Sequence, residues 1–192
     1  NDYEVTLDDE KEEINEGLNP AVSEAIDMEI AELRMYQEQA KAIVNETKAK
    51  QLLVALEKTF HKNEMLGAPK KALIFTESRR TQEYLKYFLQ NNGYQGKVVC
   101  FNGSNNDDDS KSIYRKWLSL YAGSKRISGR TIIDRKQALV DHFRTDAEIM
   151  IATESGAEGI NLQFCSLLVN YDMPWNPQRI EQRIGRCHRY GQ

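Results

Sequence analysis

From about residue 70 onward, short apolar runs alternate with amphipathic segments, and this alternation constrains the fold more than any other feature. The runs occupy residues 72–76, 97–101, 149–153 and 167–171. Continuous apolar runs of this length are typical of strands that are buried on both faces of a parallel sheet. The amphipathic segments between them provide the right-handed crossovers that parallel strands require. The sequence therefore predicts an α/β fold, a parallel sheet with helices on both faces.

Two segments are expected before the α/β domain. Residues 1–18 are acidic and poor in large apolar side chains, so we expect a flexible arm there. Residues 19–66 predict a helical segment of one or two helices, with Asn19 as the N-cap and Pro20 at the first helical position. These helices pack either on the domain or on a neighbour outside the chain. Residues 67–192 then form the α/β domain, with an insertion at about 103–136.

Charge is distributed unevenly along the 192 residues. Residues 1–64 hold 16 acidic and 7 basic side chains, whereas residues 65–192 hold 13 acidic and 19 basic ones. The net charge of the second part is therefore +6, which suits a polyanionic partner. A solvated basic face with no ligand explains the same excess equally well.

The composition excludes several other classes of protein. No run of 18 apolar residues and no signal peptide is present, so we expect a cytoplasmic protein without a membrane partner. Cys100, Cys165 and Cys187 lack metal-ligand spacing, which favours free thiols in a reducing compartment. His61 and His142 are isolated in the sequence, and we predict no metal site.

The C-terminal string, residues 182–192 (QRIGRCHRYGQ), carries the strongest chemical signal. Arg183, Arg186 and Arg189 recur every three residues, which places at least two guanidiniums on the same side of a helix. Arginine is always charged, and its planar fork of donors matches phosphate oxygens. Arginines of this kind neutralise the charge that develops during phosphoryl transfer. The alternative for an arbitrary basic string is a solvated helix end.

These residues resemble motif VI of superfamily-two helicases, in the form found in the Swi/Snf group and in bacterial RapA-like enzymes. Residues 151–162 resemble motif V and residues 71–78 resemble motif IV of the same superfamily. Residues 101–104 and 172–177 are similar to the connecting segments of these proteins. The resemblance covers the chain from about residue 70 to its end, with the motifs in the expected order.

The resemblance implies a RecA-like C-terminal lobe that binds ATP and Mg²⁺ together with a first lobe. Arg186 and Arg189 are then the phosphate-facing catalytic arginines, and Gln182 lines the cleft between the lobes. Gly159 and Asn161 fall where this superfamily approaches the nucleotide. The nucleic-acid track is expected at Thr76, Ser78, Asn102, Gly103, Ser104, Thr153 and Ser155. Without the resemblance, Thr153 and Asn161 are ordinary capping residues.

The sequence has no GxxxxGK[ST] phosphate loop and no acidic segment placed to hold Mg²⁺. Both belong to the first lobe in this superfamily, so we expect the chain alone to bind no nucleotide tightly and to hydrolyse no ATP. The preferred function is the second motor lobe of a bacterial, nucleoid-associated translocase on double-stranded DNA. The alternatives are the lobe of a strand-separating helicase and a non-catalytic docking module for a protein such as RNA polymerase.

Overall fold

The computed structural model describes residues 20–41, 47–157 and 159–187, and the chain divides into two units, residues 1–46 and residues 47–192. In the first unit, helix α2 spans Pro20–Lys41. Pro20 opens this helix as predicted, because proline already has the helical φ angle and lacks only an N–H that would find no partner there. The predicted cap Asn19 and the predicted arm, residues 1–18, lie outside the described residues.

The second unit contains a four-stranded parallel sheet. Its strands are β1 (Ala72–Thr76), β2 (Val98–Phe101), β3 (Ile149–Thr153) and β4 (Leu167–Asn170), in the spatial order β2-β3-β1-β4. The prediction of a parallel α/β sheet is confirmed. The predicted runs at 97–101 and 167–171 are each one residue too long, because Lys97 and Tyr171 already belong to the flanking loops.

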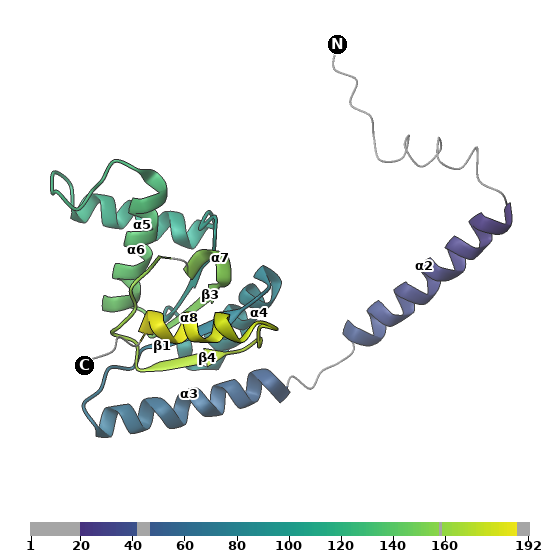
Figure 1. Ribbon diagram of the computed structural model, residues 1–192, viewed down its shortest axis with the longest axis horizontal. Coiled ribbons are helices and arrows are strands. Elements are labelled where there is room, and N and C mark those ends of the chain that lie inside the picture. The colour runs from purple at the N-terminus through teal and green to yellow at the C-terminus, as the bar shows by residue number, and fades with distance from the viewer. Residues whose placement is uncertain (1–19, 42–46, 158, 188–192) are drawn as a thin grey trace, which may run out of the picture. The chain divides into compact units, whose positions relative to one another are not determined.

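Helices cover both faces of this sheet, as Figure 1 shows. On one face, Ala72 and Ile74 of β1 pack with α3 (Thr47–Met65) and α4 (Arg79–Leu89). On the other face, Leu73 and Phe75 pack with α6 (Thr131–Thr145). Every residue of β1 is fully buried, because side chains alternate between two faces that are both covered.

Helix α4 does not end in a simple stop before β2. The helix continues into a short π-helical segment, Gln90–Tyr94, and Gly93 adopts a φ of 96° within it. Only glycine takes this left-handed conformation without a steric cost. Gly93 therefore turns the chain toward β2 from inside the segment rather than after it.

The segment 103–136 contains α5 (Asp108–Leu120), a loop and the start of α6. The buried ring of Trp117 lies 5.3 Å from that of Tyr121, so the two rings pack against each other. Trp117 Nε1 donates a hydrogen bond to Asp141 over 2.7 Å. Arg126 binds the same carboxylate over 2.9 Å and lies above the Tyr121 ring. These contacts hold the loop against the α5–α6 pair.

Two short helices complete the unit. Helix α7 (Glu154–Ala157) follows β3 directly, and α8 (Pro177–Cys187) follows the loop after β4. Asn176 Oδ1 accepts a hydrogen bond from the backbone N–H of Gln178 and thereby caps α8. No helix in the described ranges is both long and apolar enough to cross a membrane.

Candidate functional site

The carboxyl edge of the sheet brings several of the predicted nucleic-acid residues together. Thr76 and Thr153 are partners in the register between β1 and β3. Thr153 Oγ1 lies 3.5 Å from the hydroxyl of Ser155. A methyl group built on Gly103 would lie 3.2 Å from that same hydroxyl. The loop after β2 and the start of α7 therefore share one surface.

Asn102 supports the loop after β2 through hydrogen bonds of its side chain. Its side chain is buried and accepts hydrogen bonds from the backbone N–H groups of Ser104 and Asn105, over 3.2 and 2.8 Å. Its amide donates to Gln82, which in turn donates to the carbonyl oxygens of Phe101 in β2 and Ile151 in β3. Asn102 thus holds the loop in place, while Gly103 and Ser104 are exposed to solvent.

Gly156 makes the closest backbone contact of the edge. A Cβ atom at this position would lie 2.6 Å from Asn102 Cα and 2.8 Å from the carbonyl oxygen of Phe101. Backbone atoms cannot give way as a flexible side chain can, so no other residue fits without moving α7 or the loop after β2. Glycine here allows the two segments to pack directly on each other.

The hydroxyls of Thr76 and Ser78 both have partners within the protein. Thr76 Oγ1 donates to Asp172 over 2.6 Å, and Ser78 Oγ accepts the backbone N–H of Arg80 at the start of α4. Asp172 also accepts hydrogen bonds from Glu77 N–H and Lys48. Burial raises the pKa of Asp172, but these three hydrogen bonds outweigh it and keep that pKa below its usual value.

Arg183 lies at the centre of the α8 contacts and is fully buried. Its guanidinium donates to Glu154 over 2.9 Å, to Asn170 Oδ1 over 2.8 Å and to the carbonyl oxygen of Asp172 over 3.1 Å. It also stacks 4.8 Å from the ring of Phe75. Arg183 thereby ties α8 to α7, to β4 and to the sheet, and it takes no part in the open site described next.

Arg186 lines an open cavity of about 540 Å³ near the C-terminal end of α8. The cavity brings together Gly159, Asn161, Gln182 and Arg186, which are four of the five residues predicted to meet nucleotide. The fifth, Arg189, lies outside the described residues. The full lining is Gly159, Ile160, Asn161, Gln163, Gln182, Gly185 and Arg186.

Backbone contacts position this cavity. The N–H of Leu162 donates to the carbonyl oxygen of Arg186 over 3.0 Å, which joins the segment after α7 to the end of α8. Asn161 Oδ1 accepts the N–H of Gln163, and Gly159 has a φ of 77°. The described lining offers amides, a guanidinium and exposed backbone, which suit an anion or hydroxyl groups.

The described lining of this cavity has few side chains that could act as metal ligands. It contains no carboxylate among the described residues, and no group of three or more His, Cys, Asp or Glu side chains in the described ranges could hold a metal ion.

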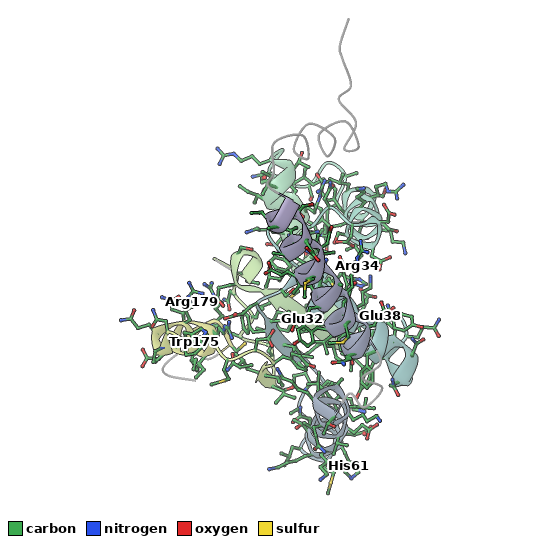
Figure 2. All side chains as sticks on the ribbon, turned by 90° about the vertical axis from the view of Figure 1, so that its right-hand side faces the viewer. Glu32, Arg34, Glu38, His61, Trp175 and Arg179 are labelled. Atoms are coloured by element: carbon green, nitrogen blue, oxygen red, sulfur yellow. The ribbon has the colours of Figure 1, made fainter. Side chains whose placement is uncertain are left out.

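The sequence reasoning missed Trp175 and Arg179. Trp175 is 99% exposed, and both residues line a hollow of about 430 Å³ with Glu77, Glu154 and Asn176. Figure 2 labels both side chains, Trp175 in the segment before α8 and Arg179 in the first turn of that helix. Trp175 stands between two prolines and outside any predicted helix or strand, so it has no place in the predicted core. That position in the sequence could have indicated an exposed aromatic side chain.

Comparison with known proteins gives a consistent assignment. Residues 47–191 match the family described as the helicase conserved C-terminal domain. The ATP-dependent helicase YqhH of Bacillus subtilis, described as uncharacterized, is 46% identical over 122 residues, which cover 64% of this chain and 17% of that protein. Helicase SWR1 of Saccharomyces cerevisiae is 32% identical over 125 residues, which cover 64% of this chain and 6% of that protein. The chain thus spans less than a fifth of these curated relatives.

A shorter match and a solved structure agree with this result. The RNA polymerase-associated protein RapA of Cronobacter sakazakii is 46% identical over 66 residues, which cover 33% of this chain and 7% of that protein. The crystal structure of the C-terminal part of the Fun30 ATPase domain covers 86% of this chain and 46% of its own, with a TM-score of 0.50 and 22% identity, and it supports the fold. The chain therefore belongs to the helicase conserved C-terminal domain family, as a RecA-like lobe related to helicases of the Swi/Snf type.

Proposed function

We propose that this chain is the second motor lobe of an ATP-driven translocase on double-stranded DNA. It supplies half of an ATP site and half of a nucleic-acid track, and it is inactive as an ATPase by itself. The observation that carries the proposal is the convergence of Gly159, Asn161, Gln182 and Arg186 on one open cavity. The neighbouring Arg183 is buried and holds the fold together, whereas Arg186 on the same helix lines the cavity.

The donors of the cavity fit a nucleotide. Arg186 suits phosphate oxygens, the amides of Asn161 and Gln182 suit hydroxyl groups, and the backbone at Gly159 allows close approach. We propose that Arg186, with Arg189, neutralises the charge that develops on the γ-phosphoryl group, and that bound ATP supplies the free energy for movement. Because the described lining lacks carboxylates, the ligands of Mg²⁺ would come from the first lobe.

We place the nucleic-acid track on the carboxyl edge of the sheet. The exposed backbone at Gly103 and Ser104, the hydroxyl of Ser155 and the first turn of α7 offer donors to phosphates. Thr153 lies beneath them, 5% exposed. The fully exposed ring of Trp175 and the guanidinium of Arg179 extend the same edge. Contacts of this kind recognise a backbone rather than a base sequence.

The test is the Arg186→Ala variant of the full-length enzyme. Losing an arginine that acts on the transition state lowers turnover by about a thousandfold or more, whereas an arginine at a cavity mouth costs the fold little. We therefore expect a folded protein that binds ATP and DNA with nearly unchanged affinity and has almost no DNA-stimulated turnover. Arg186→Lys should restore little activity, since an ammonium does not reproduce the planar fork.

Two controls make the result specific. Arg179→Ala removes an exposed arginine from the opposite end of α8 and should leave basal ATP turnover near normal while it weakens DNA stimulation. The melting temperature is measured on each preparation used for kcat. Near-normal turnover of Arg186→Ala would contradict the catalytic role proposed for Arg186.

A further inference from the structure

Two of the three free thiols in the described chain lie close in sequence to residues that line the cavity at the end of α8. Cys165 sits in the loop before β4, and Cys187 is the last residue of α8. Both are partly buried against the same apolar cluster, which includes Leu162 and Phe143. Two backbone hydrogen bonds also join the segments that carry them, through Leu162. The pair is therefore packed side by side, 22 positions apart in the sequence.

The backbone connects this pair to Arg186. The N–H of Cys165 donates to the carbonyl oxygen of Leu162 over 2.9 Å, and the N–H of Leu162 donates to the carbonyl oxygen of Arg186 over 3.0 Å. Cys187 follows Arg186 directly in α8. A change in the distance between the two sulfurs therefore acts on the residue whose side chain lines the cavity.

We propose that Cys165 and Cys187 form a peroxide-sensitive dithiol site that closes to a disulfide next to the cavity. The modification site itself stands on the packing of the two thiols. Its effect on ATP turnover rests on the proposed function.

The surroundings give the two thiols different reactivities. A hydrogen bond from the Cys165 thiol lowers the pKa of Cys187, burial opposes this shift, and the positive charge of Arg186 adds to it. The same hydrogen bond and burial raise the pKa of Cys165. Cys187 is therefore the attacking thiolate and Cys165 the resolving thiol. Burial raises the pKa of Cys100 to about 12, which makes this third thiol an unreactive internal control.

The reaction balances with hydrogen peroxide as the oxidant. The Cys187 thiolate attacks one oxygen, the O–O bond breaks, and hydroxide leaves and takes up the proton released by the thiol. The product is a sulfenic acid on Cys187. The Cys165 sulfur then attacks the Cys187 sulfur, the S–O bond breaks, and water leaves with the proton of Cys165. Two thiols and one peroxide thus give one disulfide and two waters.

Formation of the disulfide would change the geometry beside the cavity. A disulfide holds its sulfurs about 2.05 Å apart, which is closer than two hydrogen-bonded thiols. The C-terminal end of α8 would be drawn toward the loop that contains Cys165, and Arg186 would move with it. We expect oxidation to lower ATP turnover severalfold in the full-length enzyme.

The first experiment treats this chain with hydrogen peroxide and maps its thiols by mass spectrometry after non-reducing digestion. The expected result is one cross-linked peptide pair, Cys165 with Cys187, which dithiothreitol reverses, while Cys100 stays reduced. Cys100→Ser should give the same yield. Cys165→Ser should accumulate a sulfenic acid on Cys187 that dimedone traps, and Cys187→Ser should leave Cys165 reduced at the same dose.

The chain unfolded in urea is the reference, because its thiols pair without regard to native packing. Pairing in the folded chain that involves Cys100 as often as in urea, or an absence of the Cys165–Cys187 disulfide, would overturn the dithiol site. This chemical readout does not depend on the proposed function, which Arg186→Ala tests separately.

The second experiment measures ATP turnover of the full-length enzyme before and after oxidation. A severalfold loss that dithiothreitol reverses, and that Cys165→Ser abolishes, would support control of the cavity by the thiol pair. If the disulfide forms while turnover stays unchanged, the regulatory consequence is wrong.

Discussion

At the scale of single residues, Arg183 and Arg186 separate structural and accessible roles within one turn of α8. Arg183 is fully buried, and its removal would leave Glu154 and two carbonyl-type oxygens without their donor. Losing one partner of a buried ion pair costs about 3–5 kcal/mol, and we expect the lower end because Glu154 is 34% exposed. Urea denaturation of Arg183→Ala should show this loss, and Arg183→Lys should recover part of it. A change below about 0.5 kcal/mol would rule out the anchoring role.

Gly156 and Gly185 provide a second, matched comparison of single residues. A Cβ on Gly156 would meet backbone atoms of the loop after β2 at 2.6 Å, whereas a Cβ on Gly185 would meet nothing within 4 Å. Gly156→Ala should therefore lower the melting temperature by several degrees. Gly185→Ala should raise it slightly, because alanine favours a helix over glycine by about 1 kcal/mol. Equal melting temperatures for the two variants would contradict the close approach at Gly156.

At the scale of elements, α3 is an integral part of the lobe. Leu56 is fully buried against the sheet, whereas Val54 on the same helix is 40% exposed. Leu56→Ala should cost about 2–5 kcal/mol through the cavity it leaves, and Val54→Ala less than about 0.5 kcal/mol. Both values follow from the free energy of unfolding in urea. Similar costs at the two positions would mean that α3 is not held on the sheet in solution.

At the scale of the whole molecule, the uneven charge predicts how the chain meets nucleic acid. Residues 65–192 carry a net charge of +6 and residues 1–64 a net charge of −9. We expect weak binding to duplex DNA that falls as salt rises, and deletion of residues 1–18 should leave the affinity equal or slightly higher. Fluorescence anisotropy across a salt series measures both effects. Loss of binding on this deletion would show that the acidic arm, rather than the basic domain, makes the contact.

Local sequence determined most of the elements. The runs at 72–76 and 149–153 form strands with the predicted bounds, because a stretch of apolar residues has no stable alternative to burial. The order of the motifs likewise sufficed to identify the family. Four of the five predicted nucleotide residues share a cavity, because strand ends and the segments that follow them meet at one edge of a parallel sheet.

The tertiary structure alone decided which of several similar residues stay accessible. The sequence presents Arg183 and Arg186 alike, yet only the first lies over Phe75 and within reach of Glu154. The exposure of Trp175 and the packing of Cys165 and Cys187 on one apolar cluster also depend on how separate segments of the chain come together. Periodicity reports which face of an element is apolar, but the partner of each side chain is set by how the elements pack against one another.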